Sequence, residues 1–129
     1  MSKILTEISS GELLDKISIL EIKLDKIKDP PLFNKVKKEY GILTETKSKN
    51  IKYSKEIDVI YKELKQVNEK LWNIEDDIRL CEKNTDFKDK FIQLAREVYL
   101  NNDKRSVLKS KINKLLGSDI EEVKQYTKY

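Results

Sequence analysis

Apolar residues recur every three or four positions over most of the chain, which is the spacing that places them on one face of an α-helix. In the longest run, between residues 54 and 83, steps of three and four alternate without a break through Ile57, Ile60, Leu64, Val67, Leu71, Ile74, Ile78 and Cys81. A second run, between residues 87 and 116, follows the same steps but places Asn101 and Arg105 at mid-length. Alternating steps of this kind are typical of a coiled-coil heptad seam. We therefore predict two long helices, at about 54–83 and 87–116.

A short polar segment, residues 83–86, separates these two runs. A connection of this length folds two helices back on each other. Residues 54–116 should therefore form a long antiparallel hairpin. Gly117 follows the second run where helices commonly end in a left-handed residue. Residues 118–129 are expected to form a loosely ordered tail.

The first part of the chain carries two shorter apolar stripes. Ser9 and Glu12 have the spacing of a capping box, which predicts a helix over about 10–28. Asp29 and the two prolines after it end that helix and begin another, over about 31–46. The two stripes therefore predict a second, shorter hairpin.

Residues 46–53 are rich in lysine and show no apolar period, so we expect a loop there. The predicted fold class is all-α, with a long antiparallel hairpin packed against a shorter N-terminal hairpin in a four-helix-bundle-like arrangement. A chain of 129 residues is expected to form a single helical domain.

Composition agrees with long exposed helices, because 39% of the residues are charged and the chain has only three glycines and two prolines. The net charge is +4, with locally basic stretches at residues 35–55 and 104–114. A basic patch can bind nucleic acid, but here acidic residues are interleaved with the lysines and no nucleic-acid motif accompanies them. Nucleic-acid binding therefore ranks lowest among the functions considered.

The chain has no histidine and one cysteine, Cys81. This composition removes the usual near-neutral acid or base and the commonest zinc ligand. Cys81 lies on the apolar seam, so we expect a small core residue there. The first residues lack the apolar run of a signal peptide and no stretch approaches transmembrane length, so we expect a cytoplasmic protein without membrane contact. We find no catalytic constellation and favour a protein that is not an enzyme.

Arginine is scarce, since only Arg79, Arg96 and Arg105 stand among 27 basic residues. A surface charge can be lysine or arginine, whereas a planar fork that clamps a carboxylate or phosphate requires arginine. These three positions are therefore the best candidates for specific contacts.

One flank of the predicted hairpin gathers aromatic, amide and charged residues beside the seam. The candidate groove residues are Asn68, Trp72, Glu75, Arg79, Tyr99, Asn102, Arg105 and Lys109. Apolar walls with a few convergent polar groups are typical of a site for a small molecule, here one that is phosphorylated or otherwise anionic.

The same flank could instead receive the first helix. That helix offers polar groups for docking, namely Glu12, Asp15, Lys16, Ser18 and Glu21. We favour the docking interpretation, because most buried polar groups are satisfied structural groups.

Two acidic pairs, Glu12 with Asp15 and Glu75 with Asp76, supply oxygen ligands of the kind that Mg²⁺ prefers. The all-α nucleotide pyrophosphohydrolases use such pairs, but the second pair here lacks the required spacing. In a chain this rich in charge, one Glu-x-x-Asp pair carries little weight. We therefore predict no cofactor and keep magnesium as a weak alternative.

Three sequence blocks resemble a family of short bacterial and phage all-helical proteins of unknown function. They are GELLDKI at residues 11–17, LWNIEDDIR at 71–79 and LAREVY at 94–99. The resemblance implies no reaction, cofactor or catalytic residue. We therefore expect a non-enzymatic helical module that binds a protein partner or associates with itself. The alternatives are a small-ligand or phosphate-binding groove around Trp72 and, last, a nucleic-acid-binding protein.

Overall fold

The structure, a computed structural model, describes residues 2–129. Helices follow in the order α1 (Ser10–Lys26), α2 (Pro30–Asn50), α3 (Lys55–Lys83) and α4 (Asp89–Leu116). No strand occurs in these described residues. The predicted all-α, four-helix-bundle-like fold is therefore confirmed.

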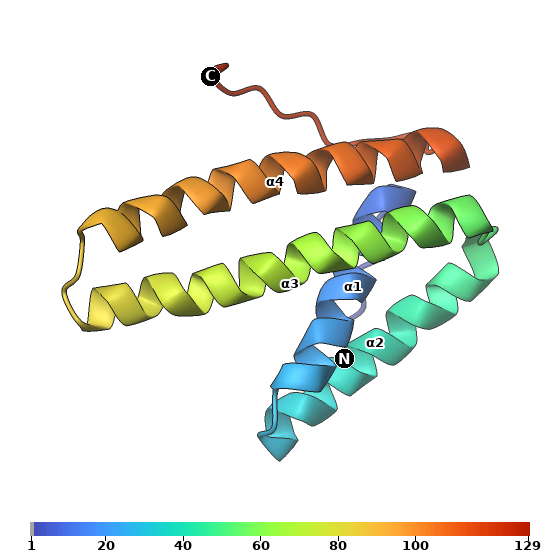
Figure 1. Ribbon diagram of the computed structural model, residues 1–129. Coiled ribbons are helices and arrows are strands. Elements are labelled where there is room, and N and C mark those ends of the chain that lie inside the picture. Colours follow the sequence, from blue (N-terminus) through green and yellow to red (C-terminus); the bar gives the residue numbers. More distant parts are fainter. Residues whose placement is uncertain (1) are drawn as a thin grey trace.

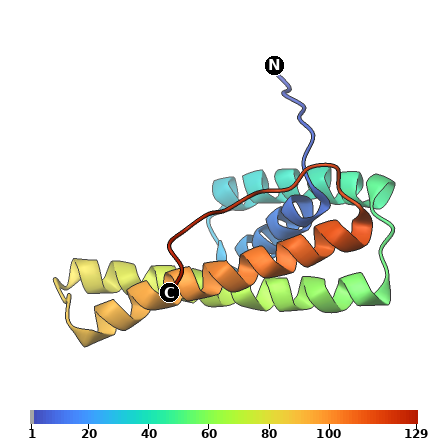
Figure 2. The same ribbon diagram turned by 90° about the horizontal axis from the view of Figure 1, so that it is seen from above.

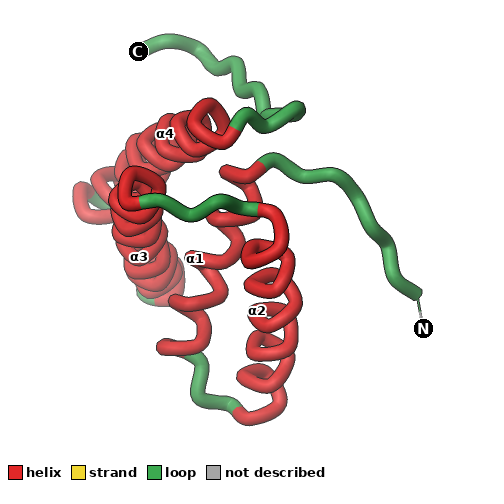
Figure 3. Tube along the Cα trace, turned by 90° about the vertical axis from the view of Figure 1, so that its right-hand side faces the viewer, coloured by secondary structure: helices red, strands yellow, loops and turns green. Residues whose placement is uncertain are grey.

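The long helices α3 and α4 lie side by side and antiparallel, joined by a short turn (Figure 1). α1 crosses this hairpin diagonally, and α2 lies along α1 on the side away from the hairpin (Figure 3). The turn between α3 and α4 projects beyond α1 and α2 (Figure 2). Since α1 contacts all three other helices, it is the element that joins the two hairpins.

Side chains at the helix ends explain where the elements begin and stop. The hydroxyl of Ser9 accepts a hydrogen bond from the backbone N–H of Glu12 at 3.1 Å, and that of Ser54 accepts from Ile57 at 3.2 Å. These bonds satisfy N–H groups that have no partner inside the helix. At the end of α4, Gly117 takes the left-handed conformation with φ 64°, which glycine adopts without steric cost.

The predicted loop over residues 46–53 is wrong in its first part, because α2 continues to Asn50. The hydroxyl of Ser48 donates to the carbonyl of Glu45 at 2.8 Å, and Lys49 pairs with Glu45 at 2.9 Å. Neighbouring side chains thus support the last turn locally. The lack of an apolar period misled the prediction, because α2 has no fully buried residue and so needs no strong apolar stripe.

The core lies where α1 meets the hairpin. It consists of Leu13, Leu14 and Ile17 from α1, Ile57, Tyr61 and Leu64 from α3, and Leu108 and Ile112 from α4. Tyr40 and Leu43 of α2 pack against its edge. No helix among residues 2–129 combines the length and apolar character needed to cross a bilayer.

α1 approaches α4 closely at Gly11. A Cβ atom at this position would lie 2.4 Å from the backbone oxygen of Lys109. The Gly11 N–H donates to Oδ1 of Asn113 at 2.7 Å, and the Ser10 N–H donates to the hydroxyl of Ser118 at 3.0 Å. The start of α1 is therefore fixed against the end of α4, and this contact sets which α1 side chains face the hairpin.

Candidate functional site

Asp15 lies at the crossing of α1 with the hairpin, and only 1% of its surface is exposed. Arg105 of α4 clamps its carboxylate with two parallel bonds, Nε to Oδ1 at 2.8 Å and Nη2 to Oδ2 at 2.5 Å. Such a bidentate pair requires the planar guanidinium of arginine. The scarcity of arginine thus pointed to a specific contact at Arg105, and the partner is a carboxylate of the same chain.

Asn68 of α3 completes this contact from the other side. Its amide nitrogen donates to Oδ1 of Asp15 at 2.9 Å and to Oγ of Ser18 at 2.8 Å. The Ser18 hydroxyl in turn donates to the backbone oxygen of Asp15 at 2.7 Å. We call Asp15, Ser18, Asn68 and Arg105 the Asp15 cluster, which links three helices through buried hydrogen bonds.

Lys109 lies one turn after Arg105 and extends the arrangement toward the end of α4. Its Nζ pairs with Oε2 of Glu12 at 2.7 Å and lies 4.0 Å from Oδ2 of Asp15. Glu122 of the tail approaches the same ammonium at 3.5 Å. Glu12 therefore pairs across helices, although the capping-box pattern would direct its carboxylate back to Ser9.

The cluster determines the ionisation of its own members. Burial alone raises the pKa of Asp15, but hydrogen bonds from Arg105 and Asn68 and the charges of Arg105 and Lys109 outweigh it, and the pKa falls below its ordinary value. The hydrogen bond from Arg105 to Asp15 raises the pKa of Arg105 against the opposing effect of burial. The pair is therefore ionised at neutral pH.

The docking residues predicted on the first helix divide into two groups. Glu12 and Asp15 pair with α4, Ser18 bonds to α3, and Glu21 accepts a hydrogen bond from the hydroxyl of Tyr61. Lys16 is half-exposed and lies 3.9 Å from Glu12 on its own helix. The polar face of α1 therefore docks on the hairpin, except at Lys16.

Beside the Asp15 cluster lies a groove of about 510 Å³. It brings together six of the eight candidate groove residues, namely Asn68, Trp72, Glu75, Arg79, Asn102 and Arg105. Asp76 and Leu71 of α3 also line it, and Ile19 and Ile22 of α1 form its opposite wall. We call this space the Trp72 groove. One part of the predicted flank is thus covered by α1, and the part beside α1 is left open.

Tyr99 and Lys109 do not line the Trp72 groove. The ring of Tyr99 lies edge-on against Tyr129, with centroids 5.5 Å apart, and Lys109 is occupied by Glu12. The helical spacing could not place Tyr99, because the tail that supplies its neighbour has no periodic pattern.

The two acidic pairs considered for magnesium make separate contacts. Glu12 and Asp15 face Lys109 and Arg105, whereas Glu75 lies 3.5 Å from Arg79 on the exposed side of α3. Within residues 2–129, no group of three or more carboxylate or thiol side chains is placed to hold a metal ion.

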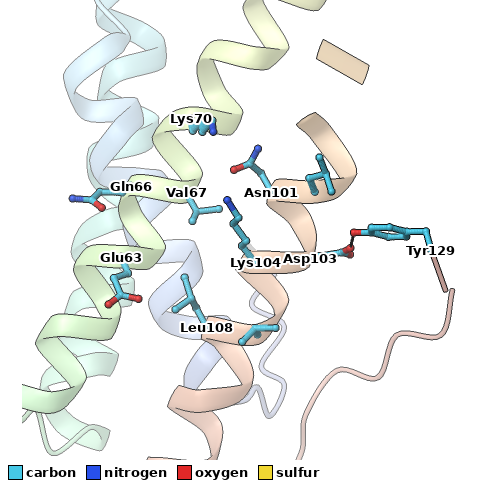
Figure 4. A pocket seen from close by; sticks show the side chains of 11 residues that line it. Glu63, Gln66, Val67, Lys70, Asn101, Asp103, Lys104, Leu108 and Tyr129 are labelled. Carbon is cyan, nitrogen blue, oxygen red and sulfur yellow. Dashed lines mark hydrogen bonds between the residues drawn. The ribbon is translucent and has the colours of Figure 1, made fainter. Parts of the chain in front are cut away.

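A second groove, of about 770 Å³, lies on the other flank of the hairpin (Figure 4). Its apolar lining comes from Val67, Leu100, Val107 and Leu108, and its polar lining includes Glu63, Gln66, Lys70, Asn101, Asp103 and Lys104. Tyr129 closes one side, where its hydroxyl donates to Asp103 (Figure 4). We call this the open-face groove. The sequence indicates this groove only through Leu100 and Val107, which are apolar, seven residues apart and outside the main seam. Neither residue is among the candidates predicted from the sequence.

Comparison with known proteins agrees with the expected family of unknown function. The model of a family described as "Family of unknown function (DUF6165)" matches residues 4–129. A search of curated proteins found no match, and neither did a search of solved structures. The matched region includes all four helices and both grooves. The chain belongs to this family of unknown function.

Proposed function

We propose that the chain is a non-enzymatic interaction module that pairs with a second copy of itself through the open-face groove. The proposal retains the expectation of a cytoplasmic bacterial or phage protein whose hairpin resembles a coiled coil. Its main support is Val107, which is 54% exposed and lines the open-face groove. Together with Leu100 it forms an apolar strip bordered by charges, which is the usual composition of a helix-docking surface.

The charges along α4 favour a second copy as the partner. In a two-fold antiparallel pair of α4 helices, paired residue numbers have a constant sum. A centre between Asp103 and Lys104 places Leu100 opposite Val107 of the other copy and Asp103 opposite Lys104 of the other copy. Because the pair of helices has two-fold symmetry, the apolar contact between Leu100 and Val107 and the ion pair between Asp103 and Lys104 each form twice.

The same register brings Arg96 opposite Lys111 of the other copy, toward the ends of the paired region. Like charges repel, so these ends oppose the association. The paired region should therefore be short and the association weak. Added salt should strengthen the association, because it screens the repulsion at the ends more than the attraction between the close central charges.

Paired charge reversals test the proposal directly. Size-exclusion chromatography with light scattering over a range of concentrations should show a monomer–dimer equilibrium. Lys104→Asp should weaken the dimer by about tenfold or more, because each Asp103 then faces an aspartate. The double variant Asp103→Lys with Lys104→Asp should restore it, since the swap recreates both opposite-charge pairs.

Lys83→Asp, at the C-terminal end of α3, is the matched control and should leave the dimer unchanged. A monomer at every concentration would refute self-pairing. A dimer that ignores Lys104→Asp would place the interface elsewhere on the molecule.

A further inference from the structure

We propose that the Trp72 groove binds an uncharged planar ligand that carries a hydrogen-bond donor next to an acceptor, as the edge of a nucleobase does. The groove lies on the flank opposite the open-face groove. The inference is therefore independent of self-pairing, and either proposal can fail without the other.

The first support is the orientation of the Asn68 amide. The hydroxyl of Ser18 donates its proton to the Asp15 carbonyl, and a carboxylate can only accept. Both neighbours of Asn68 therefore require its NH₂ group, which fixes the amide orientation. Asn68 is 5% exposed, and among residues 2–129 its Oδ1 receives no hydrogen bond. This acceptor is left for the groove that Asn68 lines.

The second support is the free edge of Arg105. Asp15 occupies its Nε and Nη2, which holds the guanidinium plane in one orientation. Nη1 carries two N–H groups, and its contact with Oδ1 of Asn102 is long, at 3.5 Å. The lining of the groove thus includes an acceptor on Asn68 and donors on Arg105, and both residues are held by the same Asp15 carboxylate. A ligand that presents a donor to Asn68 and an acceptor to Arg105 can satisfy both side chains without reorganising the protein.

The charges around the groove favour an uncharged ligand over a phosphate. Arg105 is neutralised by Asp15, and Arg79 lies 3.5 Å from Glu75. Asp76 adds a further carboxylate to the lining. With its two arginines paired, the groove has no surplus positive charge to attract a phosphate.

The walls suit a flat apolar body. Trp72 and Leu71 on one side face Ile19 and Ile22 on the other. An indole face stacks readily on a planar heterocycle. The volume of about 510 Å³ lies within the usual range for small-molecule sites, roughly 300–1,000 Å³. A nucleoside is therefore a reasonable first probe.

Trp72 is the only tryptophan in the chain, so its fluorescence reports on this groove alone. The uracil edge offers a carbonyl acceptor next to an N–H donor. Uridine should therefore quench the fluorescence in a saturable way. 3-Methyluridine, which lacks the N–H, should bind about tenfold more weakly because the Asn68 acceptor stays unpaired. Uridine monophosphate should bind no more tightly than uridine.

Two variants separate a binding role from a structural one. Asn102→Ala should weaken uridine binding several-fold while the melting temperature stays within the error of the parent protein, because Asn102 is partly exposed. Arg96→Lys, at an exposed position that lines neither groove, should leave uridine binding unchanged. The proposal is overturned if uridine gives no saturable quenching, if 3-methyluridine binds as well as uridine, or if the monophosphate binds about tenfold more tightly.

Discussion

The α3/α4 hairpin has two regions with the same apolar spacing and different surroundings. In the docked region, residues 57–68 and 101–113, α1 covers the seam, and the buried residues of the two helices include the polar Asn68 and Asn101 as well as apolar side chains. At the projecting end, residues 80–94 (Figure 2), only Cys81 is buried, and Phe91 and Leu94, which continue the apolar stripe of α4, are only partly buried. An apolar stripe therefore predicts a helix and its facing side, but it does not show how many neighbours cover that side.

The polar residues differ between the two regions in the same way. In the docked region Asp15 is held by both Asn68 and Arg105, and Arg105 is held by a two-bond contact with Asp15. Toward the projecting end, Arg79 and Glu75 form an exposed pair on one helix, which is worth little. The docked region should therefore dominate the stability of the fold, and the following predictions test this difference.

Asp15→Asn should give the largest effect, a loss of about 3 kcal/mol in the free energy of unfolding, because it leaves the buried part of Arg105 without its counter-charge. Asp76→Asn on the exposed side of α3 is the control and should change stability by no more than about 0.5 kcal/mol. Urea denaturation followed by Trp72 fluorescence measures both variants. Equal effects at the two positions would remove the distinction between the regions.

Gly11→Ala should cost about 2 kcal/mol, because its Cβ would meet backbone atoms of α4 that cannot move independently. Gly41 provides a matched control within the chain. It lies inside α2 with nothing within 4 Å of an added Cβ, so Gly41→Ala should stabilise the protein by about 0.5–1 kcal/mol. Thermal melts of the two variants should therefore shift in opposite directions, and a neutral Gly11→Ala would mean that α1 is not pressed against α4.

The dependence of stability on pH should be the smallest effect. The folded state lowers the pKa of Asp15 below its ordinary value of 3.8. Its contribution is therefore present above about pH 4 and is lost as the pH falls through the lower, folded-state pKa. Asp15→Asn should remove this part of the acid sensitivity below about pH 4. Asp58→Asn, which affects an exposed pair with Lys62, should remove much less, and indistinguishable acid profiles would contradict the account.

Helices and their caps could be predicted from sequence because they depend on neighbours within a few residues. Ser9 and Gly117 act locally, and the structure places each at a helix boundary. The end of α2 was misplaced because an exposed helix needs no apolar period. The diagonal course of α1 depends on the close approach at Gly11, which no spacing rule reveals.

The candidate site was predictable in part. Arginine scarcity and helical phase identified Arg105, and the same phase gathered Trp72 with Arg79 on one flank. The choice of Asp15 as the partner of Arg105 depends on how two helices cross, and the position of Tyr129 depends on a tail without a pattern. Both are tertiary contacts, which the spacing of residues along the chain does not specify.

The central claim is that Asp15 and Arg105 couple α1 to the hairpin, and a double-mutant cycle tests it most directly. Asp15→Asn, Arg105→Gln and the double variant are compared with the parent protein by urea denaturation. We predict a coupling free energy of about 2 kcal/mol, since the second substitution removes a charge that the first has already left unpaired. Additivity within about 0.5 kcal/mol would show that the two side chains do not interact and would contradict the account.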